Sequence, residues 1–376
     1  MKRCWTLVLA LFLVATLCAC EEIVEEETLL GFKMVVLTGA IVDDEAAYLF
    51  AEKAVKIYGS DTLIHKSTPA NFREKLWFDA FLADLLEDPS VKVLIINPAI
   101  EHFDGIFEKI RKTLPDMLIV IIRPWASDKI SEIADIVLDV NELALGRIIP
   151  EQAKKSGAKT LVHYFVPRHM GYPLPLKIQN TMKEVCREIN LEFVVAEAPD
   201  PLDDSSVPGA YQFAIDDIPL KVKEYGKDIC FYTTAWIMRE PLISATVEEG
   251  AIFAQPFFFG ELDFYRNVLD IGWNDKSIGD VKLMNQKTAA KIEDLGMSGR
   301  FSIWPIPAAM LMGTAAVEYS LAYCQGDADR EADKDLLLKC LQKAMTDYGY
   351  GNHNVHVNLA EGTDNFFLIT EDYITY

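Results

Sequence analysis

Polar and aromatic side chains follow several apolar segments of this sequence, at the point where each segment ends. Amides, hydroxyls, guanidinium groups and indoles of this kind orient a small polar ligand by hydrogen bonds and stacking. We therefore expect a ligand-binding site built from such side chains: Thr38, Gly39, Asn97, Arg123, Trp125, Tyr164, Arg168, His169, Thr234, Trp236 and Gln255.

Arg168 and His169 are the favoured part of this site, because two such neighbours on one loop indicate more than a structural role. The other residues have simpler interpretations. Thr38-Gly39 is also typical of an ordinary turn. Arg123 is suited to an ion pair between two lobes of the protein, which are predicted below. Each tryptophan, taken singly, is better explained as a cap on the core.

The sequence offers little for catalysis or for a cofactor. It has no G-x-S-x-G or H-E-x-x-H motif, and Thr38-Gly39-Ala40 lacks the further glycines of a dinucleotide-binding loop. Four widely spaced cysteines without a CxxC pair make a zinc site improbable, and a disulfide between the last two is possible but not favoured: Cys186, Cys230, Cys324 and Cys340. We expect no metal, no cofactor and no enzymatic activity.

Apolar strands alternate with amphipathic helices from residue 33 onward. Near-continuous Val/Ile/Leu strands separated by helices are typical of a parallel sheet covered on both faces. The expected strands are 33–37, 62–65, 91–96, 117–122 and 136–140, then 159–165, 193–196, 228–233 and 252–256, with a last strand at 366–369. The pattern restarts after residue 150, so we predict an α/β fold of two doubly wound parallel-sheet lobes joined by a hinge.

The expected lobes exchange segments late in the chain. Lobe 1 comprises residues 32–145 and 306–348, and lobe 2 comprises residues 146–305 and 349–376. Hinge segments are expected near 141–150, 300–307 and 349–353. Because ligands bind beyond the carboxyl ends of parallel strands, the site should lie in the cleft between the two lobes.

The first residues have the pattern of an export signal. Lys2 and Arg3 precede an apolar run that is too short to span a bilayer. Leu17-Cys18-Ala19-Cys20 then resembles the bacterial lipobox, which predicts cleavage of residues 1–19 and lipid attachment to Cys20. The alternatives are attachment at Cys18 and plain secretion without lipid. Residues 20–31 are rich in glutamate and predict a solvated tether to the extracytoplasmic face of the cell membrane.

The charge of the chain excludes some partners. It has 36 basic and 57 acidic residues, and removal of Lys2 and Arg3 with the signal changes the net charge from −21 to −23. Nucleic acid and an anionic bilayer surface both require a cationic footprint. We therefore expect no nucleic acid as a partner and membrane contact through the lipid only.

One segment carries a family resemblance. Val162-His163-Tyr164-Phe165-Val166-Pro167-Arg168-His169-Met170 is similar to the His-Tyr-x-x-Pro-Arg-His-Met stretch of a bacterial lipoprotein family that shares a domain of unknown function. Further similarity runs from Gly209-Ala210-Tyr211-Gln212-Phe213 to Glu240-Pro241-Leu242-Ile243. The two-lobe plan resembles the type I periplasmic binding protein fold.

The resemblance implies a pair of ligand-binding lobes that serves a membrane partner, most often an ABC importer. Type I sugar binders tend to carry Asn-Asp after the strand that corresponds to 229–233, whereas this chain has Thr234-Ala235-Trp236. An indole in place of a hydroxyl-binding pair favours a flatter, more aromatic ligand.

The expected function is therefore that of a lipid-anchored solute-binding protein, which captures a small polar ligand for a membrane permease or receptor. The alternatives are a ligand sensor that signals to a membrane receptor without transport, and a surface hydrolase that uses a carboxylate in the cleft as its base.

Overall fold

The computed structural model describes residues 31–70, 75–97, 104–124, 129–203, 206–254, 263–272 and 279–376. Phe32–Tyr376 forms one unit. Cys20, the expected signal peptide and all but the last residue of the expected tether lie outside the described residues. In the part of the chain that the structure describes, no helix combines the length and the apolar character needed to cross a bilayer.

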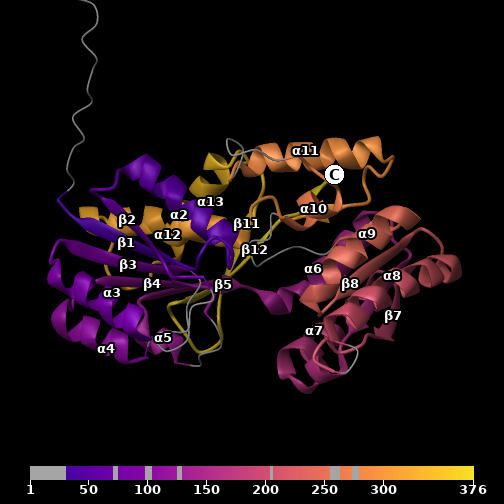
Figure 1. Ribbon diagram of the computed structural model, residues 1–376, viewed down its shortest axis with the longest axis horizontal. Helices are drawn as coiled ribbons and strands as arrows, with labels where there is room; N and C mark the ends of the chain where they lie inside the picture. Colours follow the sequence, from indigo (N-terminus) through magenta and orange to yellow (C-terminus); the bar gives the residue numbers. More distant parts are fainter. Residues whose placement is uncertain are drawn as a thin grey trace, which may run out of the picture. The chain divides into compact units, whose positions relative to one another are not determined.

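The first sheet has seven strands in the order β11-β12-β5-β4-β3-β1-β2 (Figure 1). All neighbouring pairs are parallel except β11 with β12. The strands are β1 (Lys33–Thr38), β2 (Leu63–Ser67), β3 (Val91–Asn97), β4 (Leu118–Ile122), β5 (Ile136–Val140), β11 (Val355–Leu359) and β12 (Phe366–Glu371).

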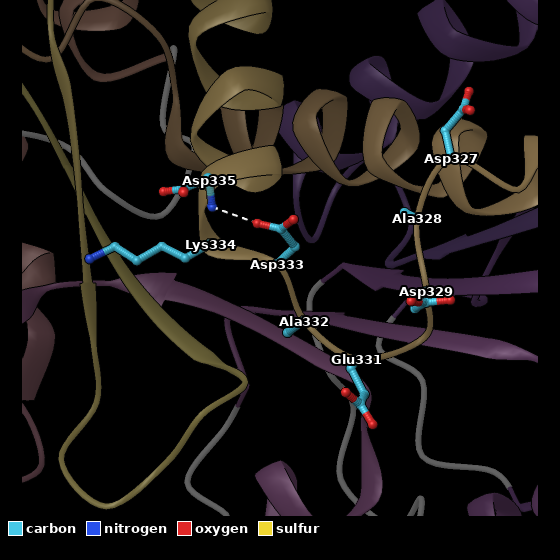
Figure 2. A pocket seen from close by; sticks show the side chains of 8 residues that line it. All are labelled: Asp327, Ala328, Asp329, Glu331, Ala332, Asp333, Lys334 and Asp335. Atoms are coloured by element: carbon cyan, nitrogen blue, oxygen red, sulfur yellow. Dashed lines mark hydrogen bonds between the residues drawn. The ribbon is translucent and has the colours of Figure 1, made fainter.

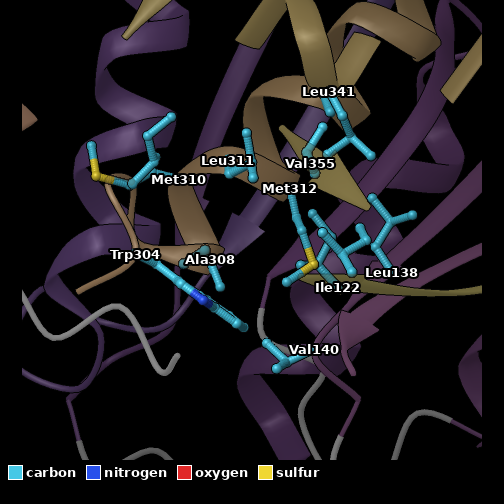
Figure 3. Close-up of a cluster of buried hydrophobic side chains, with 14 of the residues drawn as sticks. Ile122, Leu138, Val140, Trp304, Ala308, Met310, Leu311, Met312, Leu341 and Val355 are labelled. Carbon is cyan, nitrogen blue, oxygen red and sulfur yellow. The ribbon is translucent and has the colours of Figure 1, made fainter. Parts of the chain in front are cut away.

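Helices cover both faces of this sheet, because successive side chains of a strand point to opposite faces and here both sets are apolar. Val36, Val120 and Leu138 pack in one core with α2 (Glu45–Tyr58), α12 (Ala308–Gln325) and α13 (Lys334–Asp347). Figure 3 shows this core around Ile122, Leu138 and Met312. The opposite face packs against α3 (Lys75–Glu87), α4 (Asp104–Thr113) and the short α5 (Ile130–Ile133).

The second sheet has four parallel strands in the order β7-β6-β8-β9. They are β6 (Thr160–Phe165), β7 (Glu192–Glu197), β8 (Ile229–Thr233) and β9 (Ile252–Phe253). Leu161 and Cys230 pack toward α6 (Leu145–Lys155) and α7 (Pro173–Glu188), whereas Val162 and Phe231 pack toward α8 (Ser206–Tyr225) and α9 (Arg239–Glu249).

The remaining elements are short or connect the two sheets. They are α10 (Asp263–Val268), α11 (Val281–Asp294), the strand pair β10 (Ser302–Ile303) with β13 (Ile374–Thr375), and the 3-10 helices η1 (Glu142–Ala144), η2 (Pro167–Gly171) and η3 (Trp236–Met238).

Two sheets with parallel strands confirm the predicted fold class, but one hinge segment and one lobe boundary were predicted wrongly. The chain passes between the sheets after β5, between β10 and α12, and between β12 and β13. The third passage therefore follows Glu371 and is not at 349–353. Because β12 pairs in parallel with β5, residues 355–371 belong to the first sheet and not to lobe 2. The predicted strand 252–256 ends at Phe253.

The four cysteines that the structure describes are free thiols. Cys324 and Cys340, whose pairing the sequence left open, are therefore not joined. Burial raises the pKa of both thiols to about 11, so both are protonated at neutral pH.

The contact of α12 with α2 gives a stability prediction. A Cβ atom built on Gly313 of α12 would lie 2.6 Å from the ring of Phe50 in α2. Gly313→Ala should therefore lower the free energy of unfolding by about 1–3 kcal/mol in urea denaturation. Gly105→Ala is the matched control, because Gly105 is helical and nothing lies within 4 Å of its added Cβ. The control should be neutral or slightly stabilising. Equal effects of the two substitutions would contradict the close packing of α12 on α2.

Candidate functional site

Each sheet has a point where the order of its strands reverses. In the first sheet β1 lies between β2 and β3, and in the second β6 lies between β7 and β8. Ligands of open α/β sheets bind beyond the carboxyl ends of the strands at such a switch point. Thr38, Gly39 and Asn97 lie at the first switch point. The loop after β6 and Thr234 lie at the second.

Arg123 is buried at the first switch point and joins three elements. Its Nε and Nη2 donate to Asn97 Oδ1 at 3.3 and 3.1 Å, and Nη2 also pairs with Asp44, the N-cap of α2. Asn97 Nδ2 in turn donates to the carbonyl of Ala309 at 3.0 Å. The ion pair therefore lies within lobe 1 and is not the pair between lobes that the sequence suggested.

The backbone of Arg123 is strained. Its φ is +52°, in the left-handed region that a residue with a Cβ seldom adopts, and it precedes Pro124, which restricts it further. Such strain costs on the order of 1–3 kcal/mol and is typical of functional sites. Here it turns the guanidinium at the end of β4 toward Asn97 and Asp44.

Thr38 belongs to a hydrogen-bonded chain that runs from its buried hydroxyl to Glu52, whose side chain is 44% exposed. Its Oγ1 lies 2.8 Å from the Gly39 carbonyl oxygen and 2.8 Å from His65 Nε2, and His65 Nδ1 lies 2.7 Å from Glu52 Oε1. This hydroxyl–imidazole–carboxylate order resembles a catalytic triad. However, Thr38 is fully buried, so its hydroxyl cannot reach a substrate and instead fixes the end of β1.

Tyr164 was predicted wrongly as a ligand-binding residue. It is fully buried, its ring stacks on Phe231, and its hydroxyl donates to Asp217 Oδ2 at 2.8 Å. The cause is the alternation of side chains along β6, which directs Tyr164 to the face covered by α8. Trp125 and Gln255, two further predicted site residues, lie outside the described residues.

The second switch point keeps Arg168, His169 and Thr234 together. Arg168 makes a two-pronged pair with Asp200, from Nε to Oδ2 at 2.7 Å and from Nη2 to Oδ1 at 3.2 Å. His169 Nδ1 lies 3.1 Å from Thr234 Oγ1. Arg168 therefore does have a structural partner, Asp200, which sequence reasoning missed because it lies 32 residues away.

The charges at this loop are compensated. The hydrogen bond from Arg168 holds the pKa of the Asp200 carboxyl below its usual range, so the ion pair is complete at neutral pH. Burial, and then the charge of Arg168, lower the pKa of His169, which keeps its imidazole neutral. The side chain of Arg168 is still 40% exposed and can contact a ligand.

Two aromatic side chains flank these groups. Trp236, at the start of η3, is 64% exposed, and Tyr172, directly after η2, is 55% exposed. Trp236 therefore does not cap the core. Tyr172 was not identified from the sequence, although it lies only three residues after His169.

Two carboxyl groups lie where the chain leaves the first sheet after β5. Burial raises the pKa of Asp139 from 3.8 to about 7, and burial also raises the pKa of Glu142 in η1, which the charge of Arg239 in α9 partly offsets. A further ion pair joins residues far apart in the sequence, because Arg266 Nη1 of α10 lies 3.2 Å from Glu45 Oε2 of α2. Acidic groups of lobe 1 thus lie near basic groups of lobe 2.

Two hollows are open at the surface. One, of about 460 Å³, lies beside the Arg168–Asp200 pair and is lined by Pro167, Arg168, Glu197, Ala198, Pro199, Asp200, Asp203 and Phe213. It extends the second switch point toward the edge strand β7.

The other hollow, of about 500 Å³, lies in the acidic loop Asp327–Asp335 between α12 and α13. Figure 2 shows its carboxylates pointing in different directions, and Asp333 is used as the N-cap of α13. Arg330 and Tyr323 bond the carbonyls of Pro115 and Asp116, just before β4 begins. This hollow therefore lies at the amino ends of the strands, opposite to the switch point. Among the described residues, no group of three or more His, Cys, Asp or Glu side chains is arranged to hold a metal ion.

The raised pKa of Asp139 gives a pH prediction. Below about pH 3 the carboxyl is protonated in the folded and unfolded chain alike, so its raised pKa does not change the free energy of unfolding. As the pH rises toward 7 only the unfolded chain ionises readily, and the folded state loses stability. Asp139→Asn should therefore raise the free energy of unfolding by about 2–4 kcal/mol at pH 8 and by little at pH 4.

Chemical denaturation across this pH range measures the difference. Asp61→Asn, at an exposed position just before β2, is the control and should have a small effect at every pH. A stability difference for Asp139→Asn that does not change between pH 4 and 8 would contradict the burial of this carboxyl.

The fold has known counterparts. A candidate transcriptional regulator from Clostridium difficile 630 superposes with a TM-score of 0.80 at 22% identity, over 92% of this chain and 99% of that one. A sugar ABC transporter protein from Actinomyces odontolyticus ATCC 17982 has a TM-score of 0.51 at 8% identity, over 79% of this chain and 84% of that one. At these identities the likeness shows the fold alone, which is that of the type I periplasmic binding proteins.

Relatives are also found by sequence. Two uncharacterized proteins of Treponema pallidum (strain Nichols) are 34% and 30% identical over 181 and 203 residues. These matches span 48% and 50% of this chain and 83% and 91% of the relatives. Residues 32–302 match the family model described as "Protein of unknown function (DUF3798)", a span that includes the Pro167-Arg168-His169-Met170 loop and both switch points. The chain belongs to this family.

Proposed function

We propose that this protein is a solute-binding protein, which captures a small polar ligand between its two sheets and delivers it to an ABC importer in the membrane. The observation that carries the proposal is the pair of switch points. Each is at the carboxyl end of a parallel sheet and carries a preformed polar cluster, Arg123–Asn97–Asp44 in one sheet and Arg168–Asp200 with His169–Thr234 in the other.

The proposal is also supported by the passages between the sheets. Three short segments join the lobes, so hinge closure needs backbone rotation at few residues. Glu371 Oε2 accepts a hydrogen bond from the Ile306 amide at 3.2 Å, which ties two of these segments together. The Glu45–Arg266 pair adds a polar contact between residues of the two lobes that closure would bury further.

Binding is a better interpretation than catalysis. The one hydroxyl–imidazole–carboxylate chain described above is inaccessible at Thr38, and His65 is likewise buried. A transporter role is supported by the fold shared with the Actinomyces odontolyticus sugar ABC transporter protein. The identity of the ligand does not follow from that likeness.

The lipid anchor completes the proposal. A lipobox-like Leu17-Cys18-Ala19-Cys20 and a glutamate-rich tether would keep the binding lobes at high effective concentration near a membrane partner. In bacterial cells expressing the full chain, Cys20→Ser should abolish incorporation of labelled palmitate and release the protein from the membrane fraction. Cys18→Ser is the control and should retain both. Lipid labelling that survives Cys20→Ser would contradict attachment at this cysteine.

A thermal-shift screen of the purified chain from residue 21 tests ligand binding. The panel contains hexoses, nucleosides, flavins and amino acids. A ligand at a concentration 100-fold above its Kd should stabilise the folded state by about 2.7 kcal/mol. Arg168→Gln should reduce the shift in Tm, because the guanidinium group of the proposed site is removed. The shift is measured against the variant's own ligand-free Tm, since the substitution also removes the ion pair with Asp200.

Arg187→Gln on α7 is the matched control, since Arg187 is an exposed arginine of the same lobe. It should preserve the full shift. If the best ligand stabilises all three proteins equally, the second switch point is not the binding site.

A further inference from the structure

The hydrogen bonds within the second switch point do not explain why the indole of Trp236 is exposed to solvent. Other large aromatic side chains of this lobe, such as Tyr164, Phe231 and Phe253, are fully buried. Trp236 is 64% exposed and lies two residues beyond Thr234. An indole combines a large apolar face with one hydrogen-bond donor, and tryptophan is enriched at binding interfaces for this reason.

Tyr172 is a second exposed aromatic side chain, which follows His169 in the sequence as Trp236 follows Thr234. Its amide donates to the His169 carbonyl at 3.1 Å, which fixes it one turn beyond the histidine, and its ring is 55% exposed. His169 and Thr234 form one hydrogen-bonded pair. The exposed ring of Tyr172 follows His169 in the sequence, and the exposed ring of Trp236 follows Thr234. The pair bridges the ends of β6 and β8, and so brings the loops that carry the rings together.

The polar groups between these loops are mostly occupied. Both carboxylate oxygens of Asp200 accept hydrogen bonds from Arg168, and Oδ1 also accepts one from the Leu202 amide at 3.0 Å. Recognition of adjacent sugar hydroxyls relies on side chains with free paired donors and acceptors. Both carboxylate oxygens of Asp200 already accept hydrogen bonds, whereas the two aromatic side chains are exposed.

We propose that the ligand carries a flat heteroaromatic ring, such as a nucleobase, which stacks on Trp236 and directs its polar edge toward His169 and Thr234. This inference rests on the proposed solute-binding function and specifies the ligand class of the same site. Stacking on an aromatic side chain is open to any base, because every base has a flat face, and its loss weakens binding by roughly 10-fold or more.

Isothermal titration of the purified chain from residue 21 tests the proposal with adenosine and uridine, and with ribose and glucose as probes that lack the ring. The nucleosides should bind and the sugars should not. Trp236→Ala should weaken nucleoside binding about 10-fold or more, and Trp236→Phe should restore most of it. Leu202→Ala is the matched control, because Leu202 is a 75% exposed apolar residue near Asp200, and it should leave the Kd unchanged.

The outcomes separate the two proposals. Sugar binding that is as tight in Trp236→Ala as in the unchanged protein would overturn the heteroaromatic class and leave the solute-binding function standing. Nucleoside binding that is insensitive to Trp236→Ala would overturn the stacking role. If no compound of the wider panel binds either, both the ligand class and the solute-binding function fail. Circular dichroism of Trp236→Ala and Trp236→Phe should match the unchanged protein, since the indole is exposed.

Discussion

Burial of both faces of each parallel sheet is the constraint on which the rest of this structure depends. With helices on either side, the inner strands must be mainly apolar along their length, as in Leu118–Ile122, which is buried at every position. Most of the polar side chains of the candidate site therefore lie at the strand ends and in the loops that follow them. All the strands of the second sheet and six of the seven in the first run parallel. Within each sheet, the carboxyl ends of these strands therefore lie at the same edge. That edge is where the polar clusters are found.

These clusters are held in place mainly by their own pairing. Arg123 is compensated by Asp44, and Arg168 by Asp200, so neither arginine presents an uncompensated charge. Partial burial makes such pairing necessary, since a lone buried charge is costly. A ligand at this edge would meet a rigid, nearly neutral surface. Such a surface suits a small uncharged molecule better than a phosphate, and in our proposal the exposed rings of Trp236 and Tyr172 supply its apolar contacts.

Much of the fold could be predicted from the sequence because buried parallel strands have a simple signature. The strands β1 to β8 were predicted within a few residues of their observed bounds, and β5 (Ile136–Val140) with its observed bounds. The apolar run of β12 was recognised as a strand, but its partner was not, because Phe366–Ile369 would suit either sheet. Its partner sets the position of the third passage between the lobes.

The candidate site could be predicted only in outline. Strand ends located the switch points, yet the direction of each side chain depends on one residue of register, which explains the error at Tyr164. The partners Asp44, Asp200 and His65 were missed because they lie 79, 32 and 27 residues from the groups they bind. Arg168, which the sequence suggested to be a free ligand-binding group, is one member of an ion pair with Asp200.

The central claim is that the two sheets close over a ligand held at their carboxyl ends. Small-angle X-ray scattering of the purified chain from residue 21 tests it most directly, with and without a saturating concentration of the most stabilising compound of the panel. We expect a smaller radius of gyration with the compound, and no change when the same compound is added to Arg168→Gln at a concentration where that variant does not bind. An unchanged radius of gyration in a protein that the compound demonstrably stabilises would contradict closure of the lobes.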